Sequence, residues 1–149
     1  MENKTDKLLE ALEAAKKQFK PLAKNGKNNF FKTQNGVHEY STLVDIKNAT
    51  EEALNAHGLS LYYTITFEND LHFLTTNLVH TGTGQFIQSK SVIGGATNTP
   101  QQNGSGITYY RRYHIQAMLN LEADFDDDGN KASNVEKKEE KKQPIKGGL

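Results

Sequence analysis

Residues 101–130, QQNGSGITYYRRYHIQAMLNLEADFDDDGN, carry the densest chemical pattern in the chain and decide the expected fold. Small and polar residues open the stretch, and an acidic Asp-Asp-Asp-Gly-Asn segment closes it. Between them, apolar residues recur at steps of three and four, the spacing of one face of an α-helix. We therefore predict a helix over 105–121. Its inward face is expected to comprise Ile107, Tyr110, His114, Ala117, Met118 and Leu121.

The opposite face of this helix is rich in tyrosine and arginine. Tyr109, Arg112, Tyr113 and Gln116 recur at the same helical spacing, and Arg111 lies on the flank. Flat rings beside guanidinium groups suit unstacked bases and phosphates. The same residue types also serve oligomer interfaces and internal stacks of tyrosine on arginine. On residue chemistry alone, this face fits nucleic acid and protein contact equally well.

The upstream sequence predicts an α+β domain in which helices pack on an antiparallel β-meander. Alternation of apolar and polar residues predicts strands at 59–67, 71–80 and 85–93. Asn-Gly between two short β-prone runs, 30–33 and 37–40, predicts a hairpin. One helix is expected at 5–20. A second is expected to start at Thr42, where Asp45 completes a capping pattern, and to end at the glycine at position 58. Loops rich in turn-forming residues are expected at 24–29 and 94–104.

Composition sets the size of the domain and gives one hint about its partner. The chain has 149 residues, and its 18 basic and 18 acidic residues cancel. We expect one domain over 1–130 and a charged, disordered tail over 131–149. Lysines gather early in the chain, at Lys16, Lys17, Lys20, Lys24, Lys27, Lys32 and Lys47, and Lys90 lies near the end of the third predicted strand. This uneven distribution predicts local positive charge that could bind an anionic partner, although the net charge of the chain is zero.

The central stretch resembles the signature of the Erf-type (ERF superfamily) phage recombination proteins. The matching order is Gly104-Ser105-Gly106-Ile107-Thr108-Tyr109-Tyr110-Arg111-Arg112-Tyr113, an apolar helix, and then Asp126-Asp127-Asp128-Gly129-Asn130. Tyr40-Ser41-Thr42-Leu43 and His57-Gly58-Leu59 are similar to an earlier part of the family pattern, so the resemblance spans about residues 30–130. Gly106 departs from it, because a small residue such as alanine is expected there.

The resemblance implies a β-β-β-α core and a protein that binds single-stranded DNA. It further implies annealing of complementary strands without ATP, in phage-type recombination, by a homo-oligomeric ring or filament in the cytoplasm of a bacterial host. The residues expected to contact DNA are Arg111, Arg112, Tyr109, Tyr113, Lys90, Lys24, Lys27 and Lys32. The alternative is a protein-interaction module whose Tyr/Arg helix face binds a replication or recombination partner.

The acidic segment begins like an EF-hand loop but fails where such a loop must close around calcium. Val135 occupies the twelfth position, where a bidentate glutamate is needed. Two interpretations remain: an acidic helix exit that pairs with a basic neighbour, and weak Mg²⁺ association at Asp126 and Asp128. No further metal site or cofactor is expected.

Several function classes receive no support from the sequence. No nucleophile sits beside a base at a recognisable spacing, and no phosphate-binding G-x-x-x-x-G-K-[ST] motif is present, so we do not expect an enzyme. No segment approaches the roughly 20 apolar residues of a membrane span. The charged tail is a candidate site for recruiting a single-stranded DNA-binding protein.

Overall fold

The computed structural model describes residues 4–33 and 36–122, and the side chains of 28–37 are not among the described features. Within these residues, three helices and five strands follow one another in the order α1 (Asp6–Lys16), β1 (Gly26–Thr33), β2 (Gly36–Tyr40), α2 (Leu43–Ala56), β3 (Leu59–Glu68), β4 (Leu71–His80), β5 (Gln85–Gly95) and α3 (Pro100–Met118). The strands form a three-stranded antiparallel sheet, β3-β4-β5, and a separate β1-β2 hairpin. The predicted α+β class and its meander are confirmed.

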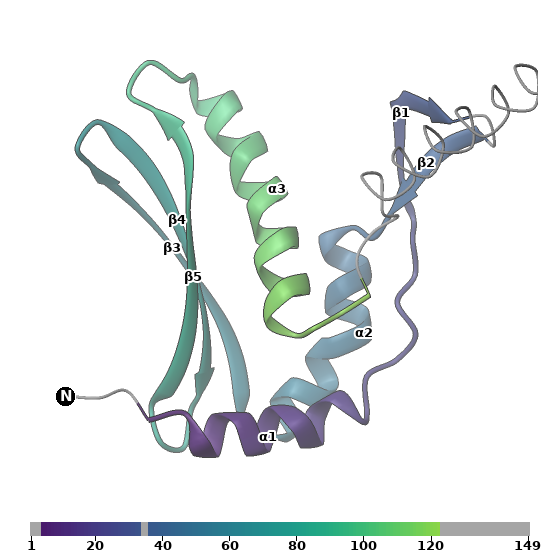
Figure 1. The fold of residues 1–149 in the computed structure, drawn as a ribbon, viewed down its shortest axis with the longest axis vertical. Coiled ribbons are helices and arrows are strands. Elements are labelled where there is room, and N and C mark those ends of the chain that lie inside the picture. The colour runs from purple at the N-terminus through teal and green to yellow at the C-terminus, as the bar shows by residue number, and fades with distance from the viewer. Residues whose placement is uncertain (1–3, 34–35, 123–149) are drawn as a thin grey trace, which may run out of the picture.

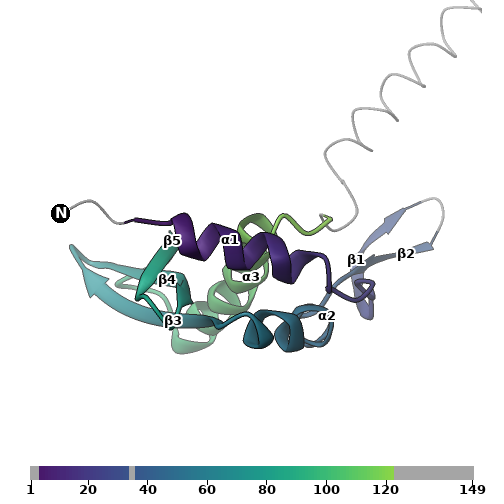
Figure 2. The same cartoon turned by 90° about the horizontal axis from the view of Figure 1, so that it is seen from below.

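Within the described residues, all three helices lie on one face of the β3-β4-β5 sheet (Figure 1). Leu74, Thr76 and Leu78 alternate along the central strand β4 and are all fully buried on this face. Leu8 and Leu12 of α1, Ile46 and Leu54 of α2, and Ile115 and Leu119 of the α3 end join Leu78 in one core cluster. The hairpin projects away from this core, as Figures 1 and 2 show.

The two turns of the meander follow from their sequences. Asn69 and Asp70 both have positive φ values, 51° and 62°, and they link β3 to β4 as a two-residue loop. This pair of left-handed residues matches the twist of an antiparallel hairpin, and Asn and Asp tolerate it better than most residues. Gly84, at φ 76°, completes the turn into β5.

Helix α3 begins five residues before the predicted position, so the expected loop over 94–104 is wrong in its second half. Thr99 accepts a hydrogen bond from the Gln102 backbone N–H, and the Gln102 side chain accepts one from the Thr99 N–H. Pro100 occupies the first helical position, where its fixed φ favours a helix. This capping box explains why the polar run 100–104 is helical.

Other boundaries and one helix face also differ from prediction. Residues 26–29 belong to β1, so Lys27 lies in a strand and not in a loop, and α1 ends at Lys16. Helix α3 ends at Met118, just before Asn120 with φ 50°. Gln116, predicted on the outward face, is buried, whereas Ala117, predicted on the inward face, is exposed. The outward-face prediction assumed one packed side, whereas α3 packs against both the sheet and α2.

The approach of α3 to β5 leaves no room for a side chain at Gly106. A Cβ there would lie 2.8 Å from the backbone oxygen of Ile93 and 3.3 Å from its Cβ. By contrast, a Cβ at Gly104 in the same helix would meet nothing within 4 Å. The family-like alanine expected at position 106 is therefore a poor fit in this chain, because the opposing atom is backbone.

These two glycines provide a matched test of that packing. Gly104→Ala is expected to raise the free energy of unfolding by about 0.5–1 kcal/mol, because alanine is the better helix former. Gly106→Ala should lower it by about 1–2 kcal/mol, because overpacking outweighs the same gain in propensity. Urea denaturation followed by circular dichroism measures both. Equal stabilisation by the two substitutions would contradict the close contact with Ile93.

Candidate nucleic-acid interface

A buried histidine fixes α3 on the sheet. His114 lies between two strands: its Nδ1 is 2.8 Å from Thr76 Oγ1 on β4, and its Nε2 is 2.7 Å from Ser91 Oγ on β5. A neutral imidazole has one donor and one acceptor, and two rotatable hydroxyls satisfy both. Burial lowers the pKa of His114, so the ring stays neutral at physiological pH. The polar position 114 is therefore an interior anchor that sets the rotation of α3 about its axis.

The lowered pKa of His114 predicts a loss of stability in mild acid. In the unfolded chain this histidine binds a proton near its ordinary pKa of 6.5, whereas the folded protein resists protonation. The unfolded state then binds more protons, so stability falls as the pH drops below about 6.5. We expect the urea midpoint to fall between pH 7.5 and 5.5. A His114→Gln variant should be less stable at pH 7.5 but should lose less on acidification. An equal pH dependence in both proteins would contradict this role.

The exposed side of α3 continues into the hairpin through a series of ring contacts. The rings of Tyr109 and Tyr113 lie 4.5 Å apart, and the Arg112 guanidinium lies 5.8 Å from the Tyr113 ring. The same guanidinium lies 4.1 Å from the ring of Tyr40, at the end of β2. Gly26, which pairs with Tyr40 across the hairpin, lies directly under that ring. We call Tyr109, Tyr113, Arg112 and Tyr40 the aromatic-cationic strip.

The base of the hairpin is held in place by one carboxylate. Asp45 accepts a hydrogen bond of 2.9 Å from the Thr42 backbone N–H, which caps α2, and one of 3.0 Å from the Asn25 backbone N–H. Burial alone would raise the pKa of Asp45, but these hydrogen bonds lower it overall. The carboxylate therefore stays ionised and ties the start of the hairpin to the start of α2. Lys24 and Lys27, both exposed, are positioned on either side of this anchor.

The eight residues predicted to contact DNA do not form a single surface. Tyr109, Tyr113 and Arg112 lie together. Lys24 and Lys27 lie at the hairpin base, where Lys27 pairs with Glu39 and therefore points to the opposite face from Tyr40. Arg111 turns the other way and stacks on Tyr63 of β3, with 4.1 Å between the guanidinium carbon and the ring centroid. Lys32 is in β1, with its side chain outside the described features.

Lys90 lies on the opposite side of the sheet from α3. Its neighbour Ser91 contacts His114, and successive residues of a strand point to opposite faces. Lys90 forms an ion pair with Glu68 at 3.7 Å and places its ammonium 4.4 Å from the Phe73 ring centroid. One DNA strand on the aromatic-cationic strip would not reach Lys90.

Tyr40 belongs to the strip but is not among the eight residues predicted to contact DNA. The Asn-Gly pair in the sequence predicts its position at the end of the hairpin. Its contact with Arg112 could not be predicted, because it joins distant parts of the chain.

The segment with Asp126 and Asp128 lies outside the described residues, as does the predicted tail over 131–149. Within 4–33 and 36–122, no three His, Asp or Glu side chains converge as a metal site would require.

Together, the fold and the strip define an α+β domain whose helix and hairpin jointly present rings and cations. Comparison with known proteins gives the family: the model of the ERF superfamily matches residues 8–146, and the chain belongs to that superfamily. This confirms the resemblance to Erf-type proteins and places the chain with phage-type recombination proteins. No curated protein and no solved structure matches the chain. In the described part of the chain, no helix has the length and apolar character needed to cross a membrane.

Proposed function

We propose that this protein binds single-stranded DNA along the aromatic-cationic strip and promotes annealing of complementary strands without ATP. The observation that carries the proposal is the continuous series of contacts from Tyr109 through Arg112 to Tyr40. It joins α3 to the hairpin in a chain that belongs to a recombination family. The proposal is that of a binding protein and not of an enzyme.

The tyrosines of the strip have the exposure that base stacking needs. Tyr109 is 50% exposed and Tyr113 is 43% exposed, although both are large aromatic residues. Every base has a π-face, so stacking on tyrosine holds a strand with little regard to its sequence. Low sequence preference is what an annealing protein requires, because it must accept any complementary pair.

Arg112 in the strip and the lysines at the hairpin base suit the phosphate backbone of the same strand. Tyr40 and Tyr113 hold the Arg112 guanidinium in position, so its ordering entropy is already lost before DNA binds. Lys24 and Lys27 add exposed positive charge at the hairpin base, with Lys27 on the opposite hairpin face from Tyr40. Contacts to the backbone and to base faces leave the pairing edges of the bases available to a second strand, which is the condition for annealing.

Self-association is part of the proposal. A single strip is short, and several copies side by side would hold a longer strand by multivalency. We propose that the protein acts as a homo-oligomer in the cytoplasm of a bacterial host, and that its tail recruits a single-stranded DNA-binding protein.

Fluorescence anisotropy of a labelled oligo-dT, with unlabelled duplex as competitor, tests the proposal. We expect preference for the single strand and a slope of log K against log salt of about −2, the value for about three neutralised phosphates. Mixing complementary oligonucleotides should then show faster annealing with protein than without it, in the absence of ATP. A folded protein that binds no oligo-dT at low salt would refute the proposed function.

A further inference from the structure

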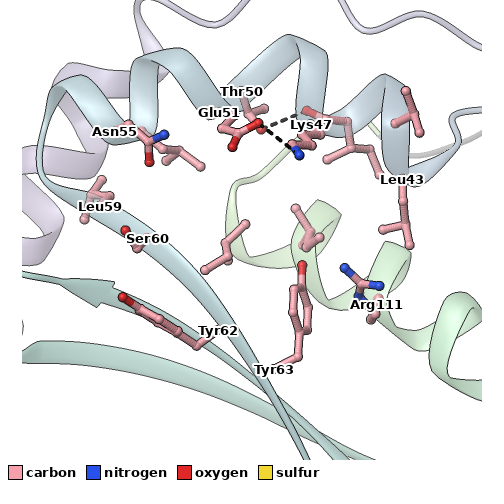
Figure 3. Close-up of a pocket in the computed structure, with 15 residues that line it drawn as sticks. Leu43, Lys47, Thr50, Glu51, Asn55, Leu59, Ser60, Tyr62, Tyr63 and Arg111 are labelled. Atoms are coloured by element: carbon pink, nitrogen blue, oxygen red, sulfur yellow. Dashed lines mark hydrogen bonds and ion pairs between the residues drawn. The ribbon is translucent and has the colours of Figure 1, made fainter.

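A groove on the other side of α3 is separate from the aromatic-cationic strip. It lies between α2 and β3 and has a volume of about 530 Å³, and Arg111 of α3 reaches toward it beside Tyr63 (Figure 3). Ile115 of α3 also lines the groove. Its volume falls within the range of about 300–1,000 Å³ that is typical of ligand sites. The α2 and β3 walls are joined by the short connection between Ala56 and Leu59.

The lining of the groove is mainly apolar. Ile46, Leu54, Leu59 and Ile115 are buried and form its floor. Val44 on the α2 rim is 63% exposed, and Tyr62 on the β3 rim is 53% exposed. Large apolar side chains at a rim leave apolar surface in water. A partner that covers this surface removes it from water, which stabilises the complex.

The groove also runs along an open strand edge. β3 pairs with β4 on one side and has no strand on its other side in the described sheet. Five consecutive β3 residues, 59–63, line the groove, although their side chains alternate between the two faces. The groove must therefore follow the edge itself, where backbone N–H and C=O groups point away from the sheet. A helix beside an open edge strand is the arrangement by which some domains take up an extended peptide as an additional strand.

One cation at the open end lacks an anionic partner. The Arg111 guanidinium stacks on Tyr63, but its Nε has no hydrogen-bond partner, and no described carboxylate pairs with it. Lys47, the other cation of the groove, is neutralised by Glu51 at 3.6 Å. The groove thus offers an apolar floor with a single uncompensated positive charge. A nucleic-acid strand, which needs a cation for each of several phosphates, fits this lining poorly.

We propose that the groove between α2 and β3 binds an extended peptide of another protein, which adds to the β3 edge, places a large apolar side chain on the groove floor, and presents a carboxylate to Arg111. Such a site would let a partner protein remain bound while the aromatic-cationic strip holds DNA, because the two sites use different sides of α3.

The test starts with a phage-displayed library of random heptapeptides, selected on the folded, immobilised protein. We expect enrichment of sequences with a large apolar residue close to an acidic one. A fluorescein-labelled synthetic copy of the most enriched peptide is then titrated by anisotropy. Val44→Asp at the groove rim and Arg111→Gln should each weaken binding at least tenfold. Leu9→Asp is the matched control, because Leu9 is also an exposed apolar residue near the start of a helix. This variant should bind the peptide with the wild-type affinity.

A second peptide, with its carboxylate replaced by an amide, tests the role of Arg111. This amide peptide should bind the wild-type protein about tenfold more weakly than the parent peptide does. The Arg111→Gln variant should bind the two peptides with equal affinity. Val44→Asp must retain oligo-dT binding, so failure of this proposal is distinguishable from failure of the proposed function. Three results would overturn the peptide site: no enriched sequence, equal binding to Val44→Asp, and displacement of the peptide by oligo-dT. Loss of self-association in Val44→Asp without any peptide binding would assign the groove to a second copy and would also overturn it.

Discussion

Replacing both Tyr109 and Tyr113 with alanine is expected to weaken binding of oligo-dT by about 100-fold, since stacking contributes about 1–3 kcal/mol per base. Both rings are half-exposed, so the fold should tolerate their removal. Anisotropy titration gives the affinities, and thermal melting by circular dichroism verifies the fold. The annealing rate at subsaturating protein should fall in parallel with the affinity.

The control for this experiment is a variant in which Tyr62 and Phe67 are both replaced with alanine. These aromatics are 53% and 54% exposed, comparable to the two tyrosines of the strip, but they belong to β3. We expect this control to bind oligo-dT as wild type does. If the Tyr109/Tyr113 variant and the control bind equally, exposed rings on α3 are not the DNA contact.

Leu8→Ala is expected to lower the free energy of unfolding by about 2–5 kcal/mol, whereas Leu9→Ala should change it by less than about 1 kcal/mol. Leu8 is fully buried in the core cluster, and Leu9 is 48% exposed. The two substitutions remove the same atoms from adjacent positions of α1, so helix propensity cancels in the comparison. Urea denaturation followed by circular dichroism measures the difference. Similar losses in both variants would show that α1 does not close the core of the sheet.

The sequence predicted the elements well where local chemistry is strong. The three strands of the meander alternate clearly and formed where they were expected. The two strands of the predicted hairpin, the Thr42–Asp45 capping box and the glycine that ends α2 are also confirmed. The start of α3 was missed although its signal was present. Thr99 and Gln102 form a capping box and Pro100 begins the helix, but the glycines and asparagines around them suggested a loop.

The candidate site was less predictable because its geometry depends on contacts between distant segments. Helical spacing placed Arg111 and Arg112 together as DNA contacts, yet one guanidinium stacks on Tyr63 and its neighbour on Tyr40. Gln116 seemed solvent-facing because nothing in its local sequence indicates that this side of the helix is packed. Lys90 was predicted near the end of its strand, but β5 continues to Gly95 and Lys90 lies at its centre, on the face opposite α3.

Photo-cross-linking tests the central claim, that DNA lies on the aromatic-cationic strip, most directly. An oligo-dT containing 5-iododeoxyuridine forms covalent bonds to aromatic side chains that stack on the modified base, and mass spectrometry of the digested product identifies them. We predict cross-links at Tyr109, Tyr113 or Tyr40, lost when Tyr109 and Tyr113 are replaced. Cross-links confined to Tyr62 or Phe73 on the sheet would contradict the strip as the DNA interface.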